Sequence, residues 1–444
     1  MLLTALAPVM ALAAANVLPL AVPTGMDLLY SDRIPFTADG EPVVTVGLMS
    51  GQERVTVRCT DGLRLDFFDE GALKQAAVPS GQAVTITVAR ATPARLRYFA
   101  DVAAIPWADA GQLEEQLAAW RARGYANVAA IAEGTALGIG GQLIDNREYH
   151  LVIPVESAAK ASTLVTMIYE RDGTRATVRT QLGKHPWARL NVEAAAHRLG
   201  VATSFVRFAS SGAQPIEVAD VEHGVGYAWH GRETRRFRGE IYIAVDPDGK
   251  LAAINVLGAE AVLAGVVPSE IFASAPPEAL KAQAVAARNQ LFAKLGRRHH
   301  AEPFHLCASQ HCQVYAGLAN EDARATDAVF ATRGEVLFLG GRLVDTVYSS
   351  SCGGFSDNRE AVWGDPADRA LRAHPDFDVA AHPELAAFAG GIGAAMVTAW
   401  VHAYPATYCS LASKARREKF RWQRSFDRSA LERLVAAQYP RSAR

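Results

Sequence analysis

Three side chains that can bind a transition metal lie within six positions of one another. Residues 305–312 read HLCASQHC, so Cys307, His311 and Cys312 can supply two thiolates and an imidazole. Sulfur and nitrogen ligands of this kind favour Zn²⁺, which usually takes four ligands in a tetrahedron. The spacing matches no standard zinc finger. The segment therefore predicts a zinc site of a less common type.

The sequence does not decide which group is the fourth zinc ligand, and it also allows a disulfide in place of a metal. Water, His305 or Cys352 would complete the ligand set. In an oxidising compartment, however, Cys307 and Cys312 can form a disulfide with each other, or either can pair with Cys352. We favour zinc because His311 adjoins the cysteines, and because the chain has five cysteines, an odd number that leaves one thiol unpaired.

Two glutamates, Glu270 and Glu278, are candidates for acid–base chemistry. A carboxylic acid stays protonated near neutral pH only if an apolar surround raises its pKa, and Val266, Val267 and Phe272 would supply that surround for Glu270. Both glutamates also have structural interpretations. Glu270 follows Pro-Ser in a loop-like context and can be a solvated carboxylate. Glu278 falls in the first turn of a predicted helix, where a glutamate stabilises the helix dipole.

A serine- and glycine-rich stretch, residues 348–354 (YSSSCGG), is a third candidate. It predicts a strand that runs into a Gly-Gly turn, where the backbone can approach a ligand closely. Hydroxyl and main-chain groups there can hydrogen-bond a polar ligand. No G-x-S-x-G sequence accompanies these serines, which argues against a Ser/His/Asp hydrolase.

A hairpin and a helix are predicted around these residues. Residues 239–245 indicate a strand, residues 246–249 (DPDG) a turn, and residues 251–257 the returning strand. A helix starts at Pro276-Pro277, and its alanine-rich face permits close packing against a neighbouring element. The mixed pattern of residues 182–234 gives way to this clear hairpin and helix, which indicates that a new domain begins near residue 235.

Five sequence blocks, in order, resemble the SpoIID/LytB family. The blocks are GVVPSE (265–270), EALKAQAVAAR (278–288), QVYAG (313–317), TRGEVL (332–337) and YSSSCGG (348–354). The resemblance covers roughly residues 235–365 and departs from the family pattern at Ile271-Phe272 and Asn289-Gln290. Members of this family are peptidoglycan-cleaving lytic transglycosylases or enhancers of cell-wall amidases.

The resemblance implies a reaction, its acid and its binding residues. Glu270 matches the family's catalytic glutamate. That group would protonate the oxygen between N-acetylmuramic acid and N-acetylglucosamine, on denuded strands, and then act as base on the muramyl C6 hydroxyl. The family also implies zinc near the groove. A non-catalytic protein that binds glycan or stimulates an amidase is the alternative. The implied glycan contacts are Glu278, Lys281, Arg288, Gln313, Tyr315, Tyr348, Ser350, Ser351, Gly353 and Gly354. Core packing explains Tyr315 equally well.

The N-terminal half predicts two further modules. Alternating apolar and polar residues between positions 43 and 98 indicate a β-rich module. Helical patterns at 109–124 and 157–171, flanked by strand-like segments, predict a β-α-β-β-α-β unit. This unit resembles SPOR domains, which bind denuded glycan strands, and a generic ferredoxin-like module fits equally well.

The fold class predicted for the whole chain is α+β and multidomain. Its expected segments are a signal-like apolar segment at 1–22, a β-rich module at 23–97, a SPOR-like module at 98–181, an unassigned connection at 182–234, a SpoIID-like domain at 235–365, and a C-terminal extension packed on that domain at 366–444.

The composition is that of a globular protein. Half of the residues are hydrophobic, and 45 Lys and Arg against 46 Asp and Glu leave a net charge of −1, so no global field attracts nucleic acid. The apolar N-terminus indicates a secretory signal, with a buried strand or disordered tail as the alternative. We therefore expect export to the periplasm or cell envelope, glycan strands or an amidase as partners, and membrane contact only through that segment.

Overall fold

The computed structural model describes residues 26–438, apart from residues 32, 140, 196, 364–366, 413 and 415. The chain divides into two compact units, Met1–Asp345 and Thr346–Arg444. Several sheets and many helices make it a multidomain α+β protein, as the sequence predicts. The predicted signal-like segment, residues 1–22, lies outside the described residues. Across the described part of the chain, no helix is both long enough and apolar enough to cross a membrane.

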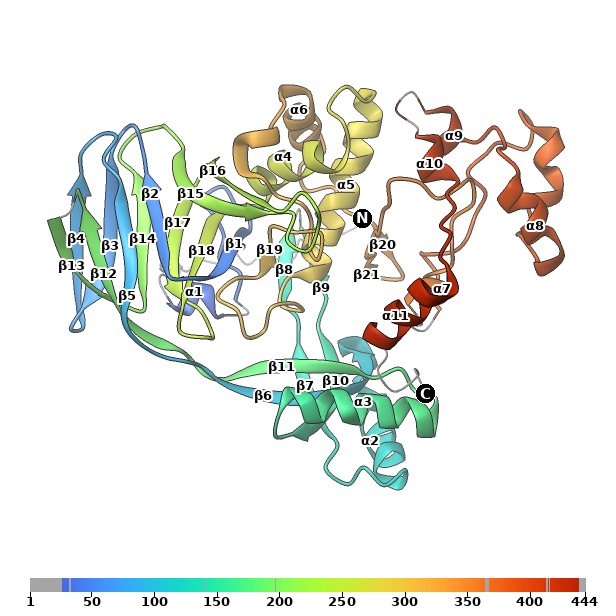
Figure 1. Cartoon of the computed structure of the whole chain (residues 1–444), viewed down its shortest axis with the longest axis horizontal. Coiled ribbons are helices and arrows are strands. Elements are labelled where there is room, and N and C mark those ends of the chain that lie inside the picture. Colours follow the sequence, from blue (N-terminus) through green and yellow to red (C-terminus); the bar gives the residue numbers. More distant parts are fainter. Residues whose placement is uncertain are drawn as a thin grey trace, which may run out of the picture. The chain divides into compact units, whose positions relative to one another are not determined.

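Seven strands of the first unit form one sheet, in the order β19-β1-β18-β17-β14-β3-β4 (Figure 1). Neighbours pair antiparallel, except that β1 and β19 are parallel. In sheet order the strands are Leu306–Cys307, Val43–Gln52, Leu251–Gly258, Glu240–Val245, Phe205–Ser210, Leu63–Asp69 and Ala72–Val78. The predicted hairpin at 239–257 is confirmed as β17 and β18.

Six strands form a second sheet, in the order β13-β12-β5-β2-β15-β16. Buried side chains of both sheets belong to one hydrophobic core, for example Val46 and Leu65 from the first and Ile86 and Leu190 from the second. Each such side chain contributes about 1.5–3 kcal/mol by leaving water. In sheet order the strands are His197–Thr203, Trp187–Ala194, Val84–Thr92, Arg54–Arg58, Ile216–His223 and Gly231–Phe237.

These pairings change the expected division of the N-terminal half. Strands from the module expected at 23–97 pair with strands of residues 187–258: β1 with β18, β3 with β14, and β5 with β12. The two regions therefore share sheets and are not separate modules. Residues 182–234, unassigned from sequence, contribute strands to both sheets. Local alternation reveals a strand but not the distant strand that completes its hydrogen bonds.

A four-stranded sheet, β11-β6-β10-β7, continues from β5 and β12 and carries two helices on one face (Figure 1). Its order confirms the predicted β-α-β-β-α-β pattern, with the hairpin β8–β9 inserted after β7. Leu117 and Trp120 of α2 and Ile168 of α3 pack on Leu151 of β10. The elements are β6 Arg95–Pro106, a 3-10 helix Trp107–Gln112, α2 Leu113–Ala122, β7 Ala129–Glu133, β8 Ala136–Ile139, β9 Gln142–Asp145, β10 Glu148–Val155, α3 Ala158–Asp172 and β11 Thr177–Lys184. We call residues 95–184 the four-stranded module.

The two ends of α3 explain where it starts and stops. The Ser157 hydroxyl accepts a hydrogen bond from the backbone N–H of Lys160, and Gly173 takes a left-handed conformation with φ of 67° at the other end.

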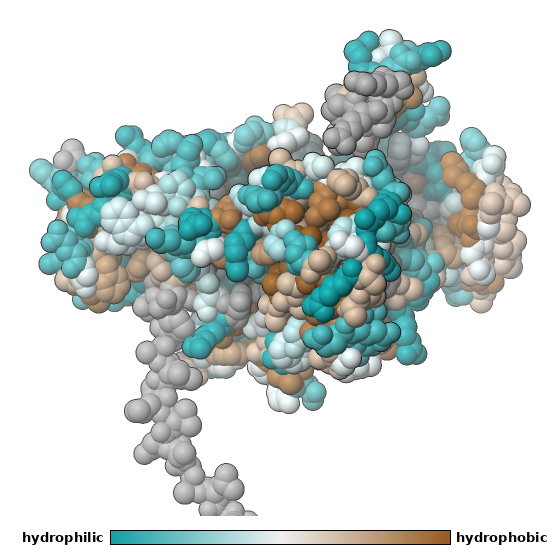
Figure 2. Space-filling model, turned by 90° about the horizontal axis from the view of Figure 1, so that it is seen from below, coloured by the Kyte–Doolittle hydropathy of each residue, from teal (hydrophilic) through white to brown (hydrophobic). Residues whose placement is uncertain are grey.

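Figure 2 shows hydrophobic groups set among hydrophilic ones on one face of the molecule. Met167 and Tyr169 of α3 and Val178 of β11 are among the exposed apolar side chains of the module.

Helices α4 (Ala259–Glu270), α5 (Pro277–Lys294) and α6 (Ala323–Ala331) follow the hairpin and contact one another. The predicted helix start at Pro276-Pro277 is confirmed. The expected loop around Glu270 is wrong, because α4 continues through Pro268 and ends at Glu270. Buried side chains such as Val262 and Val266 hold this helix in the core, so packing outweighs the proline. The remaining elements of the unit are α1 Met26–Leu29, a 3-10 helix Gly317–Asn320, β20 Phe338–Leu339 and β21 Arg342–Leu343.

The second unit is built from short helices and loops. Its small core contains Phe377, Leu385 and Trp400. The strand predicted from residue 348 is wrong: residues 348–354 are irregular, and the chain turns at Gly353 and Gly354. The helices are α7 Arg359–Trp363, a 3-10 helix Pro383–Phe388, α8 Ala394–His402, α9 Tyr408–Leu411, α10 Arg417–Phe420 and α11 Arg428–Gln438.

Candidate active site and metal centre

Glu270 ends α4 with a half-buried carboxylate. Its Oε1 accepts a hydrogen bond from the backbone N–H of Val314 at 2.8 Å. Burial raises the pKa of Glu270 above its ordinary value, although the Val314 hydrogen bond and the positive charge of Lys294 oppose the rise. Of the expected apolar neighbours, Val266 and Val267 are buried, whereas Phe272 is 41% exposed. The carboxyl is therefore fixed in place and favours the protonated form more than a solvated glutamate does.

Glu278 lies in a different environment. Its side chain is 83% exposed and forms an ion pair with Lys281 at 2.8 Å, one turn later on α5. An exposed pair of this kind contributes little stability, typically about 0.3–0.5 kcal/mol on a helix. Both residues remain available to a ligand, and their predicted contact with glycan stays a prediction.

Three of the predicted glycan contacts are buried instead. Arg288 is 0% exposed and forms a bidentate ion pair with Glu260 at 2.6 and 2.8 Å. Gln313 donates to the backbone of α5 at Ala287. Tyr315 donates its hydroxyl to Asn255 on β18 at 2.8 Å. Because these side chains are fully used inside the protein, we correct their assignment from binding to structural residues. A local pattern cannot distinguish a buried arginine from one that lines a groove.

Four ligand atoms come together around residues 299–312. His299, Cys307, His311 and Cys312 each place one ligand atom so that all four lie within 4.8 Å of one another. His299 Nε2 is 3.3 Å from the Cys312 sulfur, and His311 Nδ1 is 3.7 and 3.8 Å from the sulfurs of Cys307 and Cys312. Tetrahedral bonds to zinc of the usual lengths place a sulfur and a nitrogen about 3.5 Å apart. The donor set and spacing therefore fit Zn²⁺.

The fourth ligand was missed in the sequence. His299 is not among the ligands predicted from the sequence, yet its imidazole faces the cysteines. Of the side chains named from sequence, His305 has other partners, since its imidazole contacts the Ser31 carbonyl at 3.0 Å and the Thr45 N–H at 3.4 Å. Cys352 lies in a separate cluster with Asp376 and Cys409. The only hint in the sequence was the His299-His300 pair eight residues before Cys307.

The cysteines of this centre are suited to a metal. All five cysteines of the chain are free thiols in the structure, so none of the disulfides considered as alternatives to zinc is present. Hydrogen bonds from Cys312, His299 and Ser309 lower the pKa of Cys307 to about 2, whereas the hydrogen bond to Cys307 and burial raise the pKa of Cys312, so one of the two sulfurs is held as the thiolate. A thiolate is the form that binds metal. Four protein ligands leave no open position for water, which is typical of a structural rather than a catalytic zinc.

One loop connects the metal centre to Glu270. Residues 307–312 carry three of the ligands, and Val314, two residues later, holds the Glu270 carboxylate. Lys294 reinforces the connection, since its ammonium donates to the Cys312 carbonyl at 2.6 Å. A metal that fixes residues 307–312 would therefore also fix the N–H that positions Glu270.

Two exposed aromatic rings lie beside the same loop. Tyr227 and Trp229, between β15 and β16, stack with ring centres 4.4 Å apart and planes 16° apart. The Tyr227 hydroxyl contacts the side chain of Gln310 at 2.5 Å. Trp229 is 61% exposed. Sequence reasoning missed this pair because the region between 182 and 234 had no assignment.

The remaining predicted contacts belong to the second unit. Tyr348 is half-buried and Ser350 is exposed. The Gly353 carbonyl accepts a hydrogen bond from Arg421 at 2.7 Å, and a Cβ on Gly354 would lie 2.9 Å from Trp400. The Gly-Gly turn therefore has a packing role within its own unit. Its predicted contribution, with Ser351, to a glycan groove stays a prediction.

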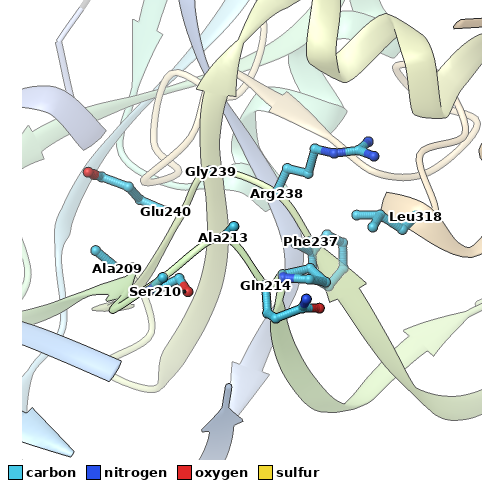
Figure 3. A pocket seen from close by; sticks show the side chains of 11 residues that line it. Ala209, Ser210, Ala213, Gln214, Phe237, Arg238, Gly239, Glu240 and Leu318 are labelled. Carbon is cyan, nitrogen blue, oxygen red and sulfur yellow. Dashed lines mark hydrogen bonds between the residues drawn. The ribbon is translucent and has the colours of Figure 1, made fainter. Parts of the chain in front are cut away.

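A cavity of about 450 Å³ lies elsewhere, where β14 and β17 approach the 3-10 helix at 317–320 (Figure 3). Ser210, Gln214, Arg238 and Glu240 are among its lining residues. None of the lining residues is a predicted catalytic, binding or metal residue, so this cavity is distinct from the site around Glu270.

Known proteins resemble part of this chain. A family described as stage II sporulation protein, SpoIID, matches residues 247–339. An uncharacterized protein of Brachyspira hyodysenteriae is 35% identical over 114 residues, 26% of this chain and 31% of the relative. An amidase enhancer of Bacillus subtilis is 39% identical over 101 residues, 23% of this chain and 13% of the relative. Stage II sporulation protein D of the same species is 31% identical over 118 residues, 23% of this chain and 34% of the relative.

These matches span about a third or less of each relative's length. The family match, residues 247–339, includes the helices and the loop that carry Glu270, His299 and the cysteine ligands. Residues 247–339 of this chain are therefore similar to the SpoIID family.

Proposed function

We propose that this protein is a lytic transglycosylase of the cell envelope that cleaves peptidoglycan glycan strands with Glu270 as its single acid and base. The observation that supports the proposal most is the carboxyl of Glu270, which is half-buried, has a raised pKa and is held by the Val314 N–H. A general acid needs this protonated and oriented form. The match to the family supplies the substrate class.

The reaction needs two proton transfers at one carboxyl. Protonated Glu270 donates to the oxygen between the muramyl C1 and the next sugar, and that C1–O bond breaks. The resulting carboxylate then takes the proton of the muramyl C6 hydroxyl as its oxygen bonds to C1. The product carries a 1,6-anhydromuramyl end, and the carboxyl is protonated again. No water enters the products.

The metal centre would hold the loop in this scheme. With zinc bound, His299, Cys307, His311 and Cys312 would form a closed site that supplies rigidity to residues 307–314. The Val314 N–H would then stay at hydrogen-bond distance from Glu270. The chemical steps themselves use only the carboxyl of this chain.

The test compares Glu270→Gln with the control Glu53→Gln, whose side chain is 77% exposed, on purified glycan strands with and without stem peptides. Mass spectrometry should detect new anhydromuramyl ends from wild type and from Glu53→Gln. Glu270→Gln should lose at least about 100-fold in rate, because amide cannot donate the proton. Anhydro ends at wild-type rate from Glu270→Gln would refute the catalytic role.

The raised pKa of Glu270 gives a pH dependence. The acid form must be present at the start of the reaction, so the rate should be constant below the pKa of Glu270 and fall about tenfold per pH unit above it. Because burial raises that pKa, the fall should begin above the ordinary glutamate range. A fall centred on the ordinary value would show that burial does not tune this group.

The second candidate function is stimulation of a cell-wall amidase without turnover. It is favoured by the relative named amidase enhancer, which is 39% identical over 101 residues. On this alternative, neither wild type nor Glu270→Gln produces anhydro ends. Both increase peptide release when a purified amidase is added to intact peptidoglycan.

A further inference from the structure

A short segment after α5 presents the fourth metal ligand. Residues 296–300, here called the strap, run from Gly296 to His300 and place His299 against the cysteines. His299 has a φ of 55°, a left-handed conformation that is uncommon for a residue with a side chain. Such a conformation persists only where the surrounding structure determines it. The contacts that determine it come from the four-stranded module.

The start of the strap is attached to the module by backbone contacts. The Gly134 N–H donates to the Gly296 carbonyl at 2.8 Å. A Cβ on Gly296 would lie 3.0 Å from Gly134, so the two chains touch at a point where only glycine fits well. Buried Asn146 donates to the carbonyls of Phe292 and Leu295 at 2.6 and 2.9 Å. Its amide thus caps the end of α5, immediately before the strap.

Charged groups attach the rest of the strap. Glu133, whose side chain is 3% exposed, contacts His300 Nε2 at 2.9 Å. Glu148 forms an ion pair with Arg297. Arg179 pairs with Glu133 and reaches Asp101, which holds Glu133 in place from the neighbouring strands. Ion pairs with this little exposure are costly to break because one charge stays buried without a partner.

These contacts come from the sheet face that carries no helix. Asp101 lies between Ala100 and Val102, whose side chains pack under the helices, so alternation along β6 directs Asp101 to the other face. His150 lies on the same face, 2.9 Å from Asp101. The polar face of the module is therefore directed at the strap.

We propose that the four-stranded module positions the metal ligand His299, with Glu133, Glu148 and Asn146 holding the strap on both sides of the turn. The inference rests on the proposed metal centre and assigns a purpose to a module that lies outside the matched family region, residues 247–339. Groups that hold a metal-ligating residue in place typically change metal affinity by about 10–100-fold when they are replaced.

The test measures zinc affinity of the purified full chain by competition with a chromophoric chelator. Glu133→Gln and Glu148→Gln should each weaken zinc binding by about 10–100-fold. The visible spectrum of the Co²⁺-substituted protein should change from that of a two-cysteine, two-histidine site toward one with a water ligand. Replacing a residue that only stabilises the fold away from the metal centre would leave this spectrum unchanged.

The matched control is Asp145→Asn. Asp145 pairs with Arg147 at 2.6 Å in the same segment of the module, and Arg147 stacks on Trp107 of the module rather than on the strap. The control should bind zinc within about twofold of wild type. If Glu133→Gln does not fold, Arg297→Ala replaces it, because Arg297 is 30% exposed and lies on the strap itself. Melting of the metal-free proteins monitors folding.

The possible results test the metal centre and the positioning role of the module separately. Wild type without zinc affinity would overturn the metal centre and this inference together. Wild-type affinity in Glu133→Gln, Glu148→Gln and Arg297→Ala would overturn only the positioning role. Equal losses in Asp145→Asn and Glu148→Gln would also overturn it, since the effect would then be general destabilisation. Glycan cleavage through Glu270 is judged separately by the anhydromuramyl product.

A second inference comes from the stacked rings of Tyr227 and Trp229. The geometry points to a sugar-binding platform: Trp229 offers an exposed ring face, and Tyr227 is anchored to Gln310 of the metal-binding loop. That loop reaches Glu270 through Val314, so the platform continues the proposed glycan site. An aromatic face with a polar rim suits the apolar side of a sugar ring, in this case an N-acetylhexosamine of the strand.

Equilibrium binding of denuded glycan strands to Glu270→Gln protein tests the platform without turnover. Adding Trp229→Ala should weaken binding at least about tenfold, as loss of a central aromatic contact does. Trp187→Ala is the control, because Trp187 is 40% exposed on β12 and its backbone pairs with Thr92 of β5. Unchanged binding after Trp229→Ala would overturn the platform. No binding by the Glu270→Gln parent would overturn glycan as the ligand.

Discussion

The two units of the chain each bring cysteines together, and the two clusters differ in what they can bind. In the first unit, His299, Cys307, His311 and Cys312 supply four ligand atoms of the types that zinc prefers. In the second unit, Cys352 and Cys409 lie with their sulfurs 3.4 Å apart, beside Asp376. Asp376 is already occupied, since it accepts the Cys409 N–H at 2.8 Å.

The difference lies in the groups around the sulfurs. Hydrogen bonds from Cys312 and His299 lower the pKa of Cys307, whereas burial raises the pKa of Cys352 to about 12. The first cluster therefore favours one thiolate, at Cys307, while the hydrogen bond to Cys307 and burial raise the pKa of Cys312; the second cluster favours the thiol at Cys352. Proximity of cysteines alone does not define a metal site; imidazole and hydrogen-bond donors decide which form the sulfur takes.

The largest expected effect is on zinc content. Cys312→Ser removes one of four ligands and should reduce bound zinc from about one ion per chain to almost none, because structural zinc binding is worth about 10 kcal/mol or more and depends on the full set. Cys409→Ser, the matched variant in the second cluster, should keep its zinc. Elemental analysis of the purified proteins measures both, and zinc lost from Cys409→Ser instead would reverse the comparison.

The second expected effect is on stability. Diamide, which accepts two electrons and two protons from two thiols, should join Cys352 to Cys409 because their sulfurs are 3.4 Å apart. Closing this loop should stabilise the second unit by about 2–4 kcal/mol. Peptide mapping identifies the bond, and urea unfolding with and without reductant gives the free energy. A bond found between Cys307 and Cys312 in zinc-loaded protein would contradict the assignment of the first cluster.

The smallest expected effect is on thiol reactivity. In reduced protein, Cys352 should react with iodoacetamide at pH 8 at least about 100-fold more slowly than a free thiol of ordinary pKa. The sign follows from its raised pKa: below pH 12 the thiol is protonated, and only the thiolate reacts. The rate should rise steadily with pH. A rate equal to that of the free thiol at pH 8 would show that Cys352 is not protected by burial.

The sequence predicted elements that depend on local signals. The hairpin of β17 and β18, the proline start of α5 and the β-α-β-β-α-β order are all present in the structure. Turn residues, capping residues and alternation act within a few positions, so they can be found without a structure.

The sequence did not predict the features that depend on contacts between distant segments of the chain. The segment that carries His299 contacts the four-stranded module, far earlier in the chain, through His300 and Glu133. The sequence predicted that Arg288 contacts glycan, but in the structure Arg288 forms a buried ion pair with Glu260. Cys409 was not paired with Cys352, because 57 residues separate them and nothing local connects the two.

The pairing of β1 with β18 has a consequence for synthesis. Val43 pairs with Gly258, and β1 also pairs with β19 at Leu306 and Cys307. At about 5–20 residues per second, a ribosome needs roughly 10–40 s to supply the partner of this strand. During that time β1 presents an apolar edge that can join another chain. The nascent chain should therefore depend on a holding chaperone until residue 258 has emerged.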